Sequence, residues 1–122
     1  MIKLEDLDVY KRSIDLANTI YYQVDKWDHF YQRSIGMQLV TAADSIAANL
    51  SEGFGRYHYK ENRTFCFYAR GSLLETKTHL QFAGKRALFN EEKIVELMNN
   101  IEIIHKMLDA YIKSIGPKPN DQ

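Results

Sequence analysis

Two long helical patterns meet at a glycine-rich corner in the middle of the chain, and this arrangement most constrains the fold. Before the corner, apolar residues recur at steps of three or four, the spacing of one helix face: Leu39, Ala43, Ile46 and Leu50. Gly53 and Gly55 are suited to the left-handed backbone that ends a helix. We therefore expect helices over residues 28–54, with Asp28 as the N-cap, and over residues 59–86.

Two further helical patterns flank this hairpin. The first begins at an acidic cap, Glu5 or Asp6, and continues to about residue 24. The last begins at Asn90, a favoured N-cap residue, and stops at Gly116-Pro117. No stretch alternates with the two-residue period of a strand. The pattern predicts an all-α protein, an antiparallel up-down-up-down four-helix bundle.

The composition limits the classes of protein to which the chain can belong. We expect one bundle domain over residues 1–116 and a short flexible C-terminal tail over residues 117–122. No apolar run approaches the roughly 18 residues of a membrane span, and the charged N-terminus does not read as a signal peptide. Cys66, the only cysteine, is expected in the core. We expect a cytoplasmic protein that needs no cofactor, binds no membrane and is not an enzyme.

Polar residues stand beside the apolar stripes on both sides of the corner. We expect six of them to form a buried polar network: Gln38, Ser45, Asn49, Glu52, Ser72 and Glu75. A buried polar group without a partner costs a few kcal/mol, so these side chains should bond one another or nearby backbone. A ligand or metal site is the alternative interpretation of the same residues.

Gly71 lies inside the third expected helix, where glycine costs about 1 kcal/mol relative to alanine. Close approach of the second helix to this backbone would explain the glycine. The residues expected to make that approach are small: Ala42, Ala43, Ala47 and Ala48.

A carboxylate-bridged metal site is the enzyme-like alternative, because helix bundles can hold such sites. Glu102 and His105 provide one Glu-x-x-His step, but Glu75 and His79 are four residues apart, so the second step is missing. The alternative site would consist of Glu52, Glu75 and His105. We expect no metal to be bound, because the set of ligands is incomplete.

Charge is balanced over the chain, with 16 basic and 16 acidic residues, but it is unevenly distributed. Between Arg56 and Arg86 basic residues clearly outnumber acidic ones. The candidate nucleic-acid-binding residues are Arg56, Tyr57, Tyr59, Lys60, Arg63 and Arg70. Cations can meet phosphates and tyrosines can stack on unpaired bases. The alternative is a solvated helix corner with amphipathic tyrosines.

The first helix carries two apolar stripes rather than one. The first stripe comprises Leu7, Tyr10, Ile14, Ala17, Tyr21 and Val24. The second comprises Val9, Leu16, Ile20 and Trp27. One stripe is enough to join a bundle, so the second is the candidate oligomer interface.

Several segments resemble the small four-helix-bundle proteins encoded within intervening sequences of bacterial 23S ribosomal RNA genes. The similarity extends from about Asp6 to Ala83. The matching segments are Asp8-Val9-Tyr10, Leu16-Ala17, Ile20-Tyr21, Gln38, Ala42-Ala43, Ser45-Ile46, Asn49-Leu50-Ser51-Glu52-Gly53, Gly55-Arg56, Glu61, Phe65, Ala69-Arg70-Gly71-Ser72 and Glu75.

The resemblance implies a four-helix bundle that assembles as a ring-shaped homopentamer and has no established enzymatic activity. It also implies a relationship to the accessory protein of diversity-generating retroelements, which acts beside a reverse transcriptase and is thought to bind nucleic acid through a basic surface. This chain differs from that branch in its zero net charge. It also carries Tyr57 and His58 where the family has a small capping residue, and it lacks a proline in the first connection. The expected partners are further copies of the chain, RNA or DNA, or another protein.

Overall fold

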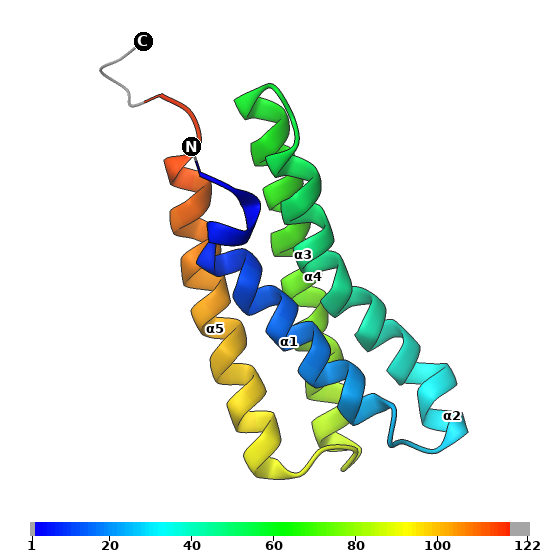
Figure 1. The fold of residues 1–122 in the computed structure, drawn as a ribbon. Coiled ribbons are helices and arrows are strands. Elements are labelled where there is room, and N and C mark those ends of the chain that lie inside the picture. Colours follow the sequence, from blue (N-terminus) through cyan, green and yellow to red (C-terminus); the bar gives the residue numbers. More distant parts are fainter. Residues whose placement is uncertain (1, 118–122) are drawn as a thin grey trace.

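The computed structural model describes residues 2–117 and is built from four long helices joined by short connections (Figure 1). The long helices are α1 (Asp8–Val24), α3 (Met37–Phe54), α4 (Tyr59–Lys85) and α5 (Glu91–Ser114). The short elements are η1 (Leu4–Asp6), α2 (His29–Tyr31) and η2 (Gln32–Gly36). No strand occurs within residues 2–117. The predicted all-α class is confirmed.

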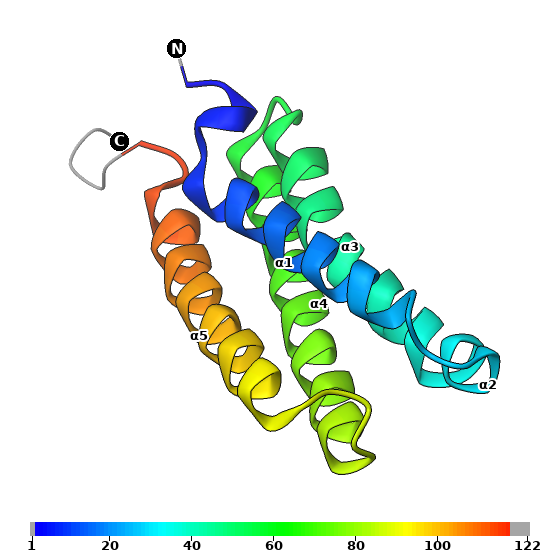
Figure 2. The same cartoon turned by 60° about the horizontal axis from the view of Figure 1, so that its bottom comes forward.

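The long helices pack as an antiparallel four-helix bundle, as predicted. α3 contacts α1 and α4, and α5 contacts α4 and α1, so the four helices form a closed square with α1 diagonally opposite α4. The corner between α3 and α4 lies at the same end as η1 and the C-terminus of α5 (Figures 1 and 2). Residues far apart in the sequence therefore meet at this end.

The second predicted helix is formed by three elements that follow one another without a break from His29 to Phe54. Its middle part, η2, is a π-helical turn, which inserts an extra residue into the helical repeat. Asp28 stands at the predicted N-cap position, although its side chain makes no capping hydrogen bond. The side-chain amide of Gln32 instead donates to the carbonyls of Val24 and Asp25 at 3.2 and 3.0 Å. Gln32 therefore ties this helix to the end of α1.

The sequence predicts some helix ends correctly and others incorrectly. The carboxamide oxygen of Asn90 accepts from the Lys93 amide at 2.7 Å, which confirms the predicted cap of α5. α1 begins at Asp8, one or two residues later than expected, because Asp6 accepts from the Lys3 amide at 3.0 Å and holds the separate turn η1. Gly55 ends α3 with φ −77°, so the left-handed conformation expected there is absent.

The core is continuous and mostly aliphatic. Its fully buried side chains include Ile20, Leu39, Ile46, Leu50, Leu73, Leu80, Leu97, Ile101, Ile104 and Leu108. Cys66 is also completely buried, as predicted, and this burial raises the pKa of its thiol to about 11. The thiol is therefore protonated at neutral pH and packs as a small apolar group.

The close approach between α3 and α4 occurs at Gly53 and not at Gly71. A Cβ atom on Gly53 would lie 2.9 Å from both the Asn62 carbonyl oxygen and the Phe65 Cβ, so only glycine fits without movement. A Cβ on Gly71 would have nothing within 4 Å. The prediction of a tight contact at Gly71 was wrong, because Gly71 faces outward from the bundle.

Within residues 2–117, no helix is long and apolar enough to span a membrane. Pro117 follows the end of α5, as expected. The remainder of the tail predicted over residues 117–122, residues 118–122, lies outside the described part of the chain.

Candidate nucleic-acid interface

The α3–α4 corner exposes aromatic side chains at one end of the bundle. Gly55 to His58 connect the two helices, and Tyr59 begins α4. The side chain of Tyr57 is 93% exposed and that of Tyr59 is 56% exposed. The Tyr57 and His58 rings meet edge to face with centroids 5.0 Å apart. Two tyrosines are thus available to solvent beside the positive end of a helix dipole.

The basic residues predicted for this interface differ in whether their charge is already paired. Arg56 forms ion pairs with Glu52 on α3 and, at 3.9 Å, with Glu61 on α4. Arg63 donates from Nη1 to the carbonyl oxygen of Ile115 at 3.1 Å, a neutral partner. Among the described residues, neither Lys60 nor Arg63 has a carboxylate within 4.0 Å. These two cations hold the uncompensated charge of the corner.

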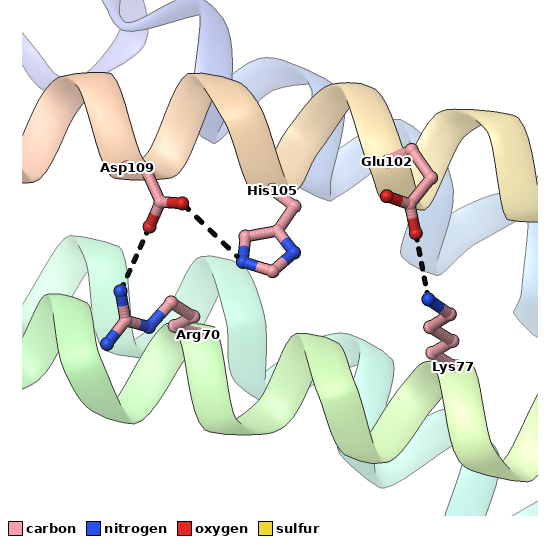
Figure 3. A network of polar contacts seen from close by, with 5 residues as sticks. All are labelled: Arg70, Lys77, Glu102, His105 and Asp109. Carbon is pink, nitrogen blue, oxygen red and sulfur yellow. Dashed lines mark hydrogen bonds and ion pairs between the residues drawn. The ribbon is translucent and has the colours of Figure 1, made fainter.

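Arg70 lies in a different environment, on the side of α4 that faces α5 (Figure 3). Its guanidinium donates to Asp109 at 3.0 Å, and the other carboxylate oxygen of Asp109 is 3.6 Å from Nε2 of His105. About two helical turns further along α4, Lys77 donates to Glu102 at 2.9 Å. We call these two ion pairs, Arg70–Asp109 and Lys77–Glu102, the α4–α5 clasp. The charge of Arg70 is compensated there, which separates it from the corner residues.

The clasp has a measurable electrostatic consequence at Glu102. The hydrogen bond from Lys77 and its positive charge hold the pKa of this carboxyl below the ordinary value of 4.5. Glu102 is therefore ionised at neutral pH. Both pairs remain half-exposed, so they contribute modestly to stability and are screened by salt.

The predicted buried polar network does not form in this chain. Gln38, Glu52 and Glu75 are exposed, and the others are only partly covered. Ser45 donates to the Thr41 carbonyl and Asn49 donates to the Ser45 carbonyl, each within its own helix, at 2.8 and 2.9 Å. Ser72 contributes only its backbone carbonyl, which accepts from the Thr76 hydroxyl. These six residues line the outer surface of α3 and α4, because the sides of the helices on which they lie face outward.

The predicted oligomer interface on α1 is also corrected. Val9, Leu16 and Ile20 are buried in the core of the single chain, at 4%, 2% and 0% exposure, so they are not available to another subunit. Trp27 packs on Phe89 with ring centroids 5.3 Å apart and donates to the Leu88 carbonyl. These four residues therefore stabilise the monomer. In the other stripe Ile14 and Tyr21 are exposed, at 37% and 49%, whereas Ala17 and Val24 are buried.

The residues of the alternative metal site each have a different neighbour. Glu52 pairs with Arg56, Glu75 lies 3.5 Å from His79, and His105 lies beside Asp109. Within residues 2–117, no three His, Cys, Asp or Glu side chains gather as they would around a metal ion. The geometry gives the metal alternative no support.

A pocket of about 300 Å³ beside the corner has no counterpart in the sequence-based predictions. Its walls come from residues on either side of η1, from α3, α4 and α5, and from the residues that follow α5. They include Phe54, Tyr59, Asn62, Tyr111 and Ser114. Burial raises the pKa of Tyr111, so its phenol is neutral at neutral pH. No local motif marks these residues, because only the fold brings them to the same end of the bundle.

The architecture and the corner together define an all-helical bundle with an exposed aromatic and basic end. The chain belongs to the 23S rRNA-intervening sequence protein family, whose family model matches residues 5–110. A crystal structure of a protein with unknown function from the S23 ribosomal protein family of Bacteroides thetaiotaomicron VPI-5482 has a similar fold, with a TM-score of 0.78. The similarity covers 87% of this chain and 96% of that one at 20% sequence identity. No curated protein matches the sequence.

Proposed function

We propose that this protein is a non-enzymatic accessory protein that binds single-stranded RNA or DNA at the α3–α4 corner. The observation that carries the proposal is the combination there of exposed tyrosines with cations that have no carboxylate partner among residues 2–117. Lys60 and Arg63 supply charge for phosphates, and Tyr57 and Tyr59 supply faces for bases. Neither the family model nor the similar structure names a reaction.

The balanced charge of the chain limits how tightly a single corner can bind nucleic acid. Two uncompensated cations release few counterions from nucleic acid, so one chain alone binds weakly. An assembly of several copies presents several corners. Once one corner has bound a strand, the other corners bind the same strand intramolecularly. Useful affinity therefore depends on self-association.

The salt dependence of binding tests the corner directly. A labelled single-stranded oligonucleotide is titrated with the wild-type chain, Lys60→Gln and Arg63→Gln between roughly 50 and 200 mM salt. Each substitution should weaken binding and reduce the slope of log K against log salt by roughly 0.7 for each contact that is lost. Unchanged affinity and slope in both variants would exclude the corner as the nucleic-acid-binding site. Absence of wild-type binding at the lowest salt would favour a scaffold or a protein partner.

Exposed apolar residues support a second part of the proposal, that the protein self-assembles. α4 carries an outer ridge of Phe67, Tyr68, Leu74 and Phe82, each at least 44% exposed. On the other side of the bundle, two shallow grooves of about 270 and 310 Å³ run between α1 and α3. Tyr21 and Met37 line the first, and Ile14 and Ala48 line the second. We propose that the α4 ridge of one copy packs against the α1/α3 groove of the next.

A contact between two different faces is head-to-tail, and such contacts close into rings when the rotation permits. The homopentamer implied by the family resemblance has this kind of symmetry. Gly71 lies within the ridge, where no described residue of its own chain comes within 4 Å of an added Cβ atom. A closely packed second copy would explain why a helix interior keeps a glycine at this position.

Light scattering tests the assembly with one matched pair of variants. Gly71→Leu improves helix propensity in the single chain but places a bulky side chain on the ridge. The variant should remain helical and fall from an assembly near five chain masses to the monomer. Asn99→Leu, an exposed substitution on α5, should leave the mass unchanged. A wild-type chain that is monomeric at micromolar concentration would contradict the proposal.

A further inference from the structure

The pocket beside the corner combines apolar walls with a few polar groups, as sites for small planar ligands do. Leu7, Phe54 and Tyr59 give it apolar and aromatic walls, and Asn62 and Ser114 give it amide and hydroxyl groups. Its volume of about 300 Å³ lies at the lower end of the range typical of ligand pockets, roughly 300 to 1,000 Å³. The size suits a single ring system better than an extended ligand.

Positive charge lies at the rim of this pocket. A Cβ atom on Gly116 would be 3.3 Å from Nη1 of Arg63 and 3.5 Å from Cδ2 of Tyr59. The guanidinium and the tyrosine ring therefore border the same point of the pocket wall. Lys60 follows Tyr59 directly in the first turn of α4 and is exposed. A ligand with one planar apolar part and one anionic part matches this arrangement.

We propose that the pocket takes one unpaired nucleobase of a single-stranded nucleic acid, with the adjoining phosphate bound by Lys60 and Arg63. This inference rests on the proposed function and names the part of the strand that the protein recognises. The base stacks on the Tyr59 ring, and its polar edge faces the part of the wall that holds Asn62 and Ser114. A duplex is excluded, because its bases are stacked and cannot enter a pocket between helix ends.

The first test compares two single-stranded oligonucleotides of about 15 residues, a size similar to known single-strand binding sites. One is oligothymidylate, and the other has the same backbone with abasic sites throughout. The wild-type chain should bind the base-containing strand roughly tenfold more tightly, and both strands should show the same salt slope. Equal affinity for the two strands would overturn the nucleobase pocket and leave only phosphate binding by Lys60 and Arg63. Binding to neither strand would overturn both proposals.

The second test fills the pocket without changing its charge. Ser114→Phe places a ring in the pocket from an exposed position, where Ser114 donates only to the Tyr111 carbonyl of its own helix. The matched control is Asn99→Phe, because Asn99 is also exposed on α5 and lies outside the residues that line the pocket. Ser114→Phe should lower the affinity for oligothymidylate roughly tenfold, to the abasic level, and leave abasic binding unchanged. Asn99→Phe should change neither the affinity for oligothymidylate nor the affinity for the abasic strand. Wild-type affinity for oligothymidylate in a folded Ser114→Phe chain would refute the pocket.

Discussion

α4 contacts its two neighbours, α3 and α5, through different chemistry. Toward α3 the backbones approach closely at Gly53, where an added Cβ would lie 2.9 Å from the Asn62 carbonyl oxygen. Toward α5, long charged side chains bridge the helices outside the core in the α4–α5 clasp (Figure 3). A contact between backbones has no room to adjust, whereas a half-exposed ion pair can rearrange or exchange with water. The two sides of one helix should therefore differ sharply in their sensitivity to substitution.

The largest expected effect comes from adding one methyl group to the α3–α4 contact. Gly53→Ala forces the new Cβ to within 2.9 Å of the Asn62 carbonyl oxygen, so the helices must move apart. We expect a loss of roughly 1 to 3 kcal/mol in the free energy of unfolding, measured by urea denaturation. Gly55→Ala is the control, because the nearest atoms to its Cβ lie at an ordinary 3.7 Å. Equal effects of the two substitutions would show that α3 and α4 do not approach each other closely at Gly53.

The connection between α4 and α5 contains a strained residue whose release should stabilise the chain. Ala87 has φ 57°, a left-handed conformation that non-glycine residues adopt at a cost. The Leu88 amide donates to the Ala83 carbonyl at 2.9 Å, which fixes this conformation at the helix end. Ala87→Gly should raise the free energy of unfolding by about 1 kcal/mol. A lower melting temperature in this variant would contradict the backbone argument.

The Arg70–Asp109 ion pair should contribute less than the tight contact on the other side of α4. Both side chains are more than one-third exposed, so solvent and salt screen their attraction. A double-mutant cycle with Arg70→Met and Asp109→Asn should give a coupling energy of roughly 0.2 to 1 kcal/mol. The coupling should decrease in about 1 M salt. A coupling energy larger than the loss of stability in Gly53→Ala would show that the α5 side of α4 is the more sensitive one.

The smallest expected effect is a pH dependence of stability that comes from the Lys77–Glu102 pair of the clasp. The folded chain holds the pKa of Glu102 below the unfolded value of 4.5. Its stabilising contribution is therefore complete above pH 4.5 and is lost as the pH falls through the folded pKa. Lys77→Met should reduce the loss of stability on acidification below pH 4.5, measured by thermal unfolding against pH. Identical acid profiles in the wild type and the variant would show that the pair is not linked to folding.

The sequence predicts the helices better than it predicts their surroundings. The three-and-four spacing places all four long helices, and the Asn90 cap follows from local backbone chemistry. The same spacing does not say which side of a helix meets its neighbours. For this reason the spacing places Val9 and Ile20 on an outer surface, although they are core residues, and Glu52 in the interior, although it is exposed.

The candidate interface illustrates the same limit. Residues adjacent in sequence, such as Tyr57, Tyr59 and Lys60, can be assigned to an exposed corner from the sequence alone. The compensation of Arg70 by Asp109 depends on contacts 39 positions apart along the chain, which no local pattern encodes. The pocket lined by Tyr59 and Tyr111 likewise depends on how the bundle brings its ends together. Long-range contacts therefore decide which predicted residues remain candidates for binding.

One binding experiment tests most directly whether uncompensated charge at the corner, and not basic charge in general, binds nucleic acid. It compares the wild-type chain with two variants of equal charge, Lys60→Gln/Arg63→Gln and Arg70→Gln/Lys77→Gln, for one single-stranded oligonucleotide at roughly 50 mM salt. Light scattering in the same buffer confirms that all three have the same mass. The corner variant should lose at least tenfold in affinity, whereas the clasp variant should stay within about twofold of the wild type. Equal losses in the two variants would contradict the account, because binding would then follow net charge alone.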